Sequence, residues 1–361
     1  MFQAAICGVW RSCVSQWLLL AMSCCALGVT GISSVRADQL FAPPGPNAEA
    51  DEILLVSARA VGTACDGQLL SEKLLCQRYE IGPDGRSYWK AVDWREALLE
   101  PTPTRTVIYV HGNRVEPGED RSRGMMIYHS LVAHGKPSEP IRYIIWSWPA
   151  TPIPGPLKDM HVKAARTRPA GWQLAWFLDQ LPAEAPLTLV GYSYGARVIS
   201  GSLHLLGGGK LNGLELTERF HPERGPMRVA MIAAAFDADW IQPGRYHERA
   251  LSQVDELVLI TNHRDPAMRL YHFSVNRGRI DALGKAGVPQ PSSLGEAAQR
   301  IVRVDATAEV GRSHSLEDYL AARGRMNVMW RRAVPAVDHP PDVESSLSGA
   351  TSSAARQLPP F

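Results

Sequence analysis

The sequence predicts an α/β fold with a mostly parallel central sheet of about eight strands and helices on both faces. Short apolar runs alternate with helical patterns along residues 53–304. The runs lack strict alternation of polar and apolar residues, which favours strands that are buried on both faces. Strands that alternate with helices form parallel sheets with right-handed crossovers. The composition agrees, because 45% apolar and 20% charged residues are typical of a globular protein.

Each expected element has its own signal. Seven apolar runs indicate strands at residues 53–56, 106–110, 141–146, 187–190, 228–232, 257–260 and 301–304. A hairpin is expected over residues 75–92, because Pro83-Asp84-Gly85 in its middle is a turn signal. Helices are expected over 157–167 and 170–181, separated at Pro169. A further helix over 196–206 has an apolar face of period three to four and ends at three glycines.

The two ends of the chain have a different character from the middle. Residues 1–37 are interpreted as a signal peptide, because the apolar run 17–32 is followed by small residues at a cleavage site after Ala37. We therefore expect a secreted or periplasmic protein. One alternative is an uncleaved anchor that holds the protein near a membrane, for which the run is short. The other is lipidation at Cys24.

The C-terminal residues 335–361 are rich in Pro and Ser and hold little to bury, so they predict a disordered tail. Residues 38–334 are then expected to form a single domain. The chain has 38 Lys and Arg against 36 Asp and Glu, a net charge of +2. This balance argues against nucleic acid as a partner.

The cysteines favour export. Four of the six lie in the leader, which leaves only Cys65 and Cys76. An isolated pair in an exported chain predicts a disulfide, here across a short loop. Two buried thiols are the alternative.

The pentapeptide Gly191-Tyr192-Ser193-Tyr194-Gly195 has the pattern G-x-S-x-G. A nucleophilic serine must stand clear of the sheet on a sharp strand-to-helix turn, and tight packing there requires small residues two positions before and after it. The apolar run before the pentapeptide and the amphipathic helix after it supply this context. Ser193 is therefore the candidate nucleophile. An ordinary tight turn is the alternative.

An earlier strand ends in His111-Gly112, followed by Asn113. Glycine at that point lets the loop approach the nucleophile closely. The backbone N–H groups of Asn113 and Tyr194 are therefore the candidate donors of an oxyanion hole. For His111 we favour a structural role, in which it ties down the loop, over a catalytic one.

With these motifs in order, residues 100–325 resemble the α/β-hydrolase family. The resemblance implies the α/β-hydrolase fold, and it implies a nucleophile, an acid and a histidine in that order, each after a strand. The implied acid is Asp265, just past the run 257–260. Asp237 and Asp239 are the alternative acids, and helix capping is the plain interpretation of Asp237.

The implied histidine is His314, which follows the last strand and lies just before a helix start. His339 falls in the expected tail, whereas His263 and His272 precede the last strand. The plain interpretation of His314 is an exposed loop residue.

The chemistry that follows is ester hydrolysis through an acyl-enzyme, on a small-molecule or lipid ester. No metal motif occurs in the sequence, so no metal or other cofactor is expected. The alternatives are an acyltransferase or peptidase with the same three groups, and a non-catalytic envelope protein of the same fold. The basic residues Lys158, Lys163, Arg166 and Arg168 are expected to form a solvated helix face.

Overall fold

The structure, a computed structural model, describes residues 51–99, 105–219, 221, 224–274 and 280–335. The chain divides into two units, Met1–Pro43 and Pro44–Phe361, and every described residue belongs to the second. The expected leader, and the expected tail from residue 336, lie outside the described residues. None of the helices within the described ranges has the length and apolarity needed to cross a bilayer.

The central sheet has nine strands within the described residues, where the sequence predicts about eight. Their order is β3-β2-β1-β5-β4-β6-β7-β8-β9. β1 and β4 to β9 run parallel, whereas β2 and β3 form an antiparallel hairpin at one edge, as the turn signal predicts. The strands are β1 (Glu52–Ser57), β2 (Leu75–Ile81), β3 (Ser87–Val92), β4 (Arg105–Val110), β5 (Ile141–Ser147), β6 (Leu187–Tyr192), β7 (Met227–Ile232), β8 (Val254–Thr261) and β9 (Ile301–Asp305).

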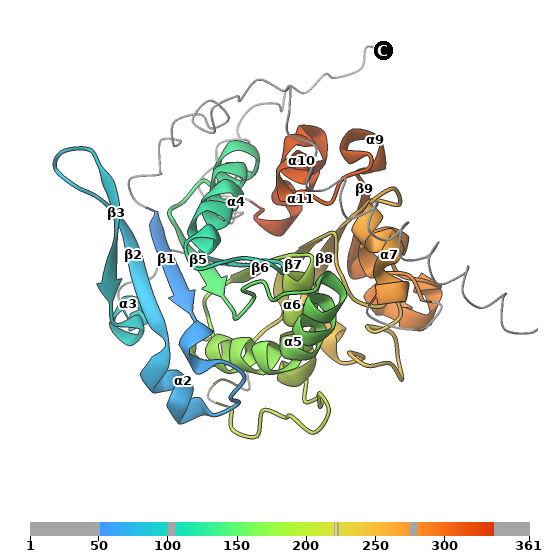
Figure 1. Cartoon of the computed structure of the whole chain (residues 1–361), viewed down its shortest axis with the longest axis horizontal. Helices are drawn as coiled ribbons and strands as arrows, with labels where there is room; N and C mark the ends of the chain where they lie inside the picture. The colour runs from blue at the N-terminus through green and yellow to red at the C-terminus, as the bar shows by residue number, and fades with distance from the viewer. Residues whose placement is uncertain (1–50, 100–104, 220, 222–223, 275–279, 336–361) are drawn as a thin grey trace, which may run out of the picture. The chain divides into compact units, whose positions relative to one another are not determined.

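Helices cover both faces of the sheet, which confirms the predicted fold class. α4 and α11 pack on one face, and α5 and α6 pack on the other (Figure 1). The helices are α2 (Gly67–Lys73), α3 (Trp94–Leu99), α4 (Glu119–Gly135), α5 (Pro156–Gln180), α6 (Tyr194–Leu206), α7 (Pro266–Ser274), α8 (Leu283–Ala286), α9 (Thr307–Val310), α10 (Leu316–Ala321) and α11 (Arg323–Ala333). Short 3-10 helices are η2 (Arg59–Val61), η3 (Ala250–Gln253) and η4 (Pro291–Arg300).

The apolar residues of the inner strands divide between two cores. In β4, Ile108 and Val110 belong to the core under α5 and α6. Val107 and Tyr109 belong to the core under α4 and α11. Successive side chains of a strand point to opposite faces, so a strand covered on both sides is apolar throughout. This explains why the runs in the sequence lack alternation.

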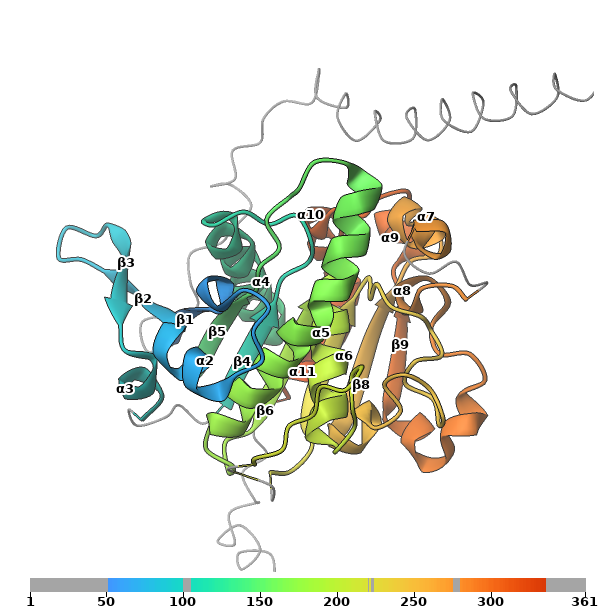
Figure 2. The same cartoon turned by 60° about the horizontal axis from the view of Figure 1, so that its bottom comes forward.

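The predicted break at Pro169 is wrong, because α5 runs through it as one helix (Figure 2). Proline removes one backbone hydrogen bond from a helix interior. The next turn compensates by packing closely on α6: a Cβ added to Gly171 would lie 3.3 Å from the carbonyl oxygen of Val198. Burial of this face outweighs the lost bond, since most helix stability in proteins comes from tertiary packing.

The predicted disulfide is also wrong, because Cys65 and Cys76 are both free thiols. Cys76 pairs within the sheet with Val56 and Val92 and packs into the apolar core, so its thiol has apolar neighbours instead of a sulfur partner. The Cys65 thiol lies 3.9 Å from the carbonyl oxygen of Thr63. Burial raises the pKa of Cys65 to about 11 and that of Cys76 to about 12. Both thiols are therefore protonated and weakly reactive at neutral pH.

Candidate active site

Ser193 lies on the turn between β6 and α6, with φ 53° and ψ −118°. A residue with a side chain rarely adopts this backbone conformation, and such strain needs support from the surroundings. The support comes from hydrogen bonds on both sides of the residue. The Ser193 N–H donates to the carbonyl of Ile232 at 2.9 Å, and its own carbonyl accepts from Ala196 at 3.1 Å.

The two glycines of the pentapeptide are required by close packing. A Cβ added to Gly191 would lie 2.7 Å from the Cα of Ala196, in the first turn of α6. A Cβ added to Gly195 would lie 2.0 Å from the carbonyl oxygen of Val110, at the end of β4. Any larger residue would push α6 away from the sheet and move the serine between them.

Three side chains from distant parts of the chain meet at this turn. Ser193 Oγ lies 3.1 Å from Nε2 of His314, and Nδ1 of His314 lies 2.7 Å from Oδ2 of Asp265. A carboxylate can only accept, so Nδ1 carries the proton and Nε2 is free to accept from the serine hydroxyl. Asp265 is fully buried, whereas the His314 side chain keeps 26% of its exposure.

Each group follows a strand, in the order that the resemblance implies. Ser193 follows β6, Asp265 follows β8, and His314 comes after β9 and the short helix α9. Because these strands are parallel neighbours or near neighbours in the sheet, their carboxyl ends lie along one edge. Residues separated by more than a hundred positions can therefore touch.

Asp265 is held by groups that the sequence did not single out. Oδ1 accepts from the backbone N–H groups of Ala267 and Met268, at 2.9 and 3.1 Å. The hydroxyl of Tyr319 in α10 donates to Oδ2 at 2.8 Å. Burial and this carboxylate raise the pKa of Tyr319, so the hydroxyl stays a donor. The carboxylate is thereby oriented toward His314.

Tyr192 and Asn262 hold the loop that carries His314. The Tyr192 hydroxyl donates to the backbone carbonyl of His314, and their rings stack with centroids 5.4 Å apart. Asn262, which follows β8, donates from Nδ2 to the carbonyl of Gly311 at 2.9 Å. Tyr192 lies inside the pentapeptide, so its position beside the serine could have indicated a role at the site. No feature of the sequence indicated such a role for Asn262 or Tyr319.

The alternative acids have other partners. Tyr271 hydrogen-bonds to the buried Asp237. Asp239 forms an ion pair with Arg245 at 3.3 Å. Of the other histidines, His263 is exposed and lies 2.9 Å from the Thr307 hydroxyl, and His339 lies outside the described residues. Asp265 is thus the carboxylate that meets His314.

The loop after β4 lies against the serine. A Cβ added to Gly112 would lie 3.3 Å from the Cβ of Ser193. The next residue, Asn113, donates from Nδ2 to Oδ2 of Asp159 in α5 at 2.8 Å. Tyr194 is the first residue of α6, so its N–H has no partner within the helix. The structure thus brings both candidate oxyanion residues beside the turn.

Asp159 belongs to a buried ion pair, which overturns the expectation of a solvated basic face at Lys163. The Lys163 ammonium lies 2.9 Å from Oδ1 of Asp159, and both side chains are fully buried. Burial opposes ionisation of Asp159, but hydrogen bonds from Lys163, Ile153 and Asn113 bring its pKa below the ordinary value. Through its hydrogen bond from Asn113, Asp159 also ties the start of α5 to the loop after β4.

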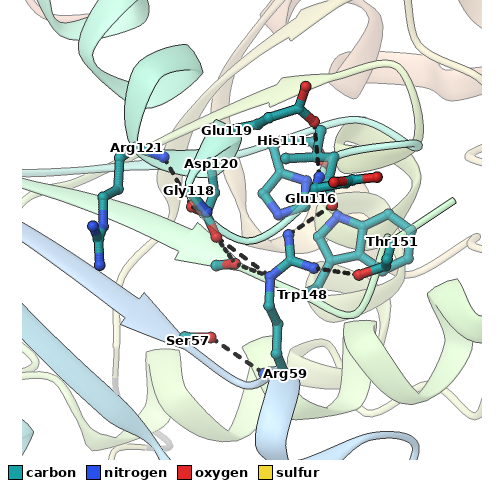
Figure 3. A network of polar contacts seen from close by, with 12 residues as sticks. Ser57, Arg59, His111, Glu116, Gly118, Glu119, Asp120, Arg121, Trp148 and Thr151 are labelled. Atoms are coloured by element: carbon teal, nitrogen blue, oxygen red, sulfur yellow. Dashed lines mark hydrogen bonds and ion pairs between the residues drawn. The ribbon is translucent and has the colours of Figure 1, made fainter.

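Arg59, just after β1, ties together the loops that follow β4 and β5 (Figure 3). Its Nε donates to the Ser147 hydroxyl at 2.7 Å and pairs with Asp120 at 3.3 Å. Its Nη2 donates to the carbonyl of Val115 at 2.9 Å, and its Nη1 donates to the Thr151 hydroxyl at 3.1 Å. Arginine suits this task because its donors are fixed in one plane.

His111 is fully buried in the same region, next to Trp148 in Figure 3. Its Nδ1 lies 2.8 Å from the carbonyl of Gly112. Its ring stacks on Trp148, whose indole N–H donates to the His111 carbonyl at 2.8 Å. Burial lowers the pKa of His111 to about 4. These contacts agree with a structural role in the loop.

The buried His111 predicts acid sensitivity of the fold. Its folded-state pKa lies below the unfolded value of 6.5, so the unfolded chain takes up the proton first. Stability is therefore complete above about pH 7 and decreases as the pH falls toward 4. We expect this group to contribute a loss of about 2 kcal/mol between pH 7 and pH 5. Urea unfolding of wild type and His111→Gln at both pH values measures the loss in the free energy of unfolding. Equal losses in the two proteins would show that His111 is not the cause.

Comparisons with known proteins give structural neighbours only. No family model matches the chain, and no curated protein sequence matches it. Acyl-protein thioesterase 2 of Zea mays is 13% identical, with 64% of this chain and 96% of that chain covered and a TM-score of 0.33. Esterase B of Lactobacillus rhamnosis, inhibited by a tributyrin phosphonate, is 10% identical, with 92% and 97% covered and a TM-score of 0.37. Carboxyl esterase 2 of Tuber melanosporum is 14% identical, with 73% and 87% covered and a TM-score of 0.33.

These identities and TM-scores are low, so the fold assignment depends on features of this chain itself. The features are a mostly parallel sheet with helices on both faces and a strained serine between the strand β6 and the helix α6. A third feature is the order of Ser193, Asp265 and His314 along the sheet edge. This combination of topology and turn geometry is that of the α/β-hydrolase fold, and the chain has that fold.

Proposed function

We propose that this protein is an exported serine hydrolase that cleaves carboxylic esters through an acyl-enzyme intermediate. The observation that carries the proposal is the continuous hydrogen-bonded chain from Ser193 through His314 to Asp265. A serine hydroxyl is a weak nucleophile at neutral pH and requires an adjacent base. The proposal of export is based on the sequence of residues 1–37 alone.

In the first half of the reaction, the Ser193 hydroxyl attacks the ester carbonyl while Nε2 of His314 accepts its proton. The imidazolium then gives this proton to the departing alkoxide, which leaves as an alcohol, and the acyl group stays on Ser193. In the second half, His314 takes a proton from water as the water attacks the acyl-enzyme. Collapse releases the carboxylic acid and returns the proton to Ser193. Asp265 stabilises the imidazolium throughout.

The negative oxygen of each tetrahedral intermediate needs donors that are already in place. The backbone N–H groups of Asn113 and Tyr194 are the proposed donors, and the N-terminal end of α6 adds a favourable dipole. One such donor contributes about 10²- to 10³-fold in rate. The contact of Asn113 with Asp159 supports this role, because it fixes the loop beside the serine.

Purified wild-type protein is expected to hydrolyse p-nitrophenyl acetate and butyrate and to react with a fluorophosphonate probe, because both reactions need an activated serine. The matched p-nitroanilides should react much more slowly, since the proposal is for an esterase. Release of p-nitrophenol and p-nitroaniline measures the two rates. Faster anilide cleavage would favour a peptidase instead. Absence of both turnover and labelling would leave a non-catalytic protein and end the proposal.

A further inference from the structure

Arg197 is a buried cation one helical turn after the serine. It lies in α6 with 8% of its surface exposed. Its guanidinium carbon lies 4.5 Å from the ring centroid of Trp240 and 5.9 Å from that of Tyr194. Aromatic faces stabilise a cation above them, but they accept no hydrogen bonds in the guanidinium plane.

The in-plane donors of Arg197 are mostly unused. Nη1 donates to the Tyr271 hydroxyl at 3.3 Å, a long contact. Within the described residues Arg197 forms no ion pair, and this hydrogen bond uses one of its five donors. Nε and Nη2 are not among the fully enclosed polar atoms of those residues, so both keep some accessible surface. A largely buried cation with most of its donors unused is costly, and this cost falls when an anion binds.

The position of Arg197 connects it to the proposed reaction. Side chains of a helix lean toward its N-terminus, which for α6 is the end where Ser193 lies. It stacks near Tyr194, the residue directly after the nucleophile. On its other side it meets Tyr271 of α7, the helix that begins directly after Asp265. The cation therefore belongs to the surroundings of the serine and not to a remote surface.

We propose that Arg197 binds a carboxylate carried by the ester substrate, so that the enzyme cleaves half-esters of dicarboxylic acids or similar monoanionic esters. The inference rests on the proposed esterase function. The planar fork of a guanidinium matches a carboxylate with two parallel hydrogen bonds. A single cation, with Asp237 bonded to the neighbouring Tyr271, favours one negative charge over a dianionic phosphate. Arg197 follows Ser193 by four residues, about one helical turn, so we expect a short spacer of a few carbon atoms between the ester and the carboxylate.

A pair of substrates that differ only in charge tests the inference. p-Nitrophenyl hydrogen adipate carries a free carboxylate, and methyl p-nitrophenyl adipate carries a neutral ester in its place. We expect wild type to prefer the acid by roughly 10- to 100-fold in kcat/KM, as charge-assisted hydrogen bonds imply. Arg197→Gln should remove most of this ratio, chiefly through KM for the acid. Arg197→Lys should recover only part of it, because an ammonium lacks the fork.

Arg245→Gln is the matched control, because Arg245 is a half-exposed arginine paired with Asp239. The ratio of kcat/KM for the acid to kcat/KM for the neutral ester is expected to be the same in this variant as in wild type.

If an Arg197 variant fails to fold, inhibition of wild type tests the carboxylate site. Free adipate is expected to compete with the neutral ester much better than adipamide does. Equal inhibition by the two, or an unchanged charge ratio in folded Arg197→Gln, would overturn the carboxylate site. Hydrolysis of the neutral ester in those cases would leave the esterase proposal intact, and no hydrolysis of either ester would remove both.

Discussion

Replacing Ser193 with alanine is expected to lower kcat for p-nitrophenyl ester hydrolysis by about 10⁴- to 10⁶-fold, as loss of the nucleophile does in known serine hydrolases. The variant removes the only atom that forms the acyl-enzyme, while the proposed oxyanion donors stay in place. Alanine lacks only the hydroxyl oxygen of serine, so it fits this buried position without a large cavity. Kinetic assays and fluorophosphonate labelling measure the loss.

Ser200 provides a matched control for this experiment. Ser200 lies in α6, and its Oγ lies 2.9 Å from Nδ1 of His247, so the two form a second serine–histidine contact. Ser200 is fully enclosed and His247 is 2% exposed, and burial lowers the pKa of His247 well below its ordinary value. No substrate can reach this pair, so Ser200→Ala should label like wild type. Labelling that persists in Ser193→Ala and disappears in Ser200→Ala would show that the nucleophile is assigned to the wrong serine.

Replacing Asp265 with asparagine is expected to lower kcat by about 10⁴-fold near neutral pH. The carboxylate keeps the proton of His314 on Nδ1, which leaves Nε2 free to accept from the serine. An asparagine amide that donates to Nδ1 favours the other tautomer, in which Nε2 carries a proton and cannot act as the base. Steady-state kinetics with p-nitrophenyl butyrate, together with thermal unfolding to establish folding, measure the effect.

Asp237→Asn is the comparison that decides between the two acids. Asp237 is bonded to Tyr271 and is not in contact with His314 among the described interactions, so a change of at most a few-fold is expected. Its unfolding temperature must be recorded as well, because Asp237 is buried. A folded Asp237→Asn protein without activity, beside an active Asp265→Asn protein, would reverse the assignment of the acid.

Local patterns were sufficient for much of the fold. The strand runs, the hairpin turn and the serine turn were all predictable, because each depends on residues that are close together in the chain. The buried character of a doubly covered strand is visible in its own composition. The requirement for glycine at 191 and 195 is visible in the spacing of the pentapeptide, and the contacts with Ala196 and Val110 supply its physical reason.

Three predictions were wrong because tertiary packing overrode a rule that depends on local sequence. Proline is a helix breaker in isolation, but α5 continues through Pro169 because its face packs on α6. Two cysteines close in sequence suggested a bond, yet Cys76 packs into the apolar core as a free thiol. Lys163 was expected in solvent, yet a buried carboxylate from the preceding helical turn neutralises it. Propensity and spacing carry no information on such burial.

The choice between Asp237 and Asp265 as the acid also depended on tertiary structure. Asp237 and Asp265 follow β7 and β8, which are adjacent and parallel, so sequence order places both carboxylates at one edge of the sheet. Side-chain direction then selects the partner: Asp265 turns toward His314 under hydrogen bonds from Tyr319 and two backbone amides, and Asp237 turns toward Tyr271. Residue types and their order thus establish which groups can react, whereas their pairing depends on packed neighbours that come from distant parts of the chain.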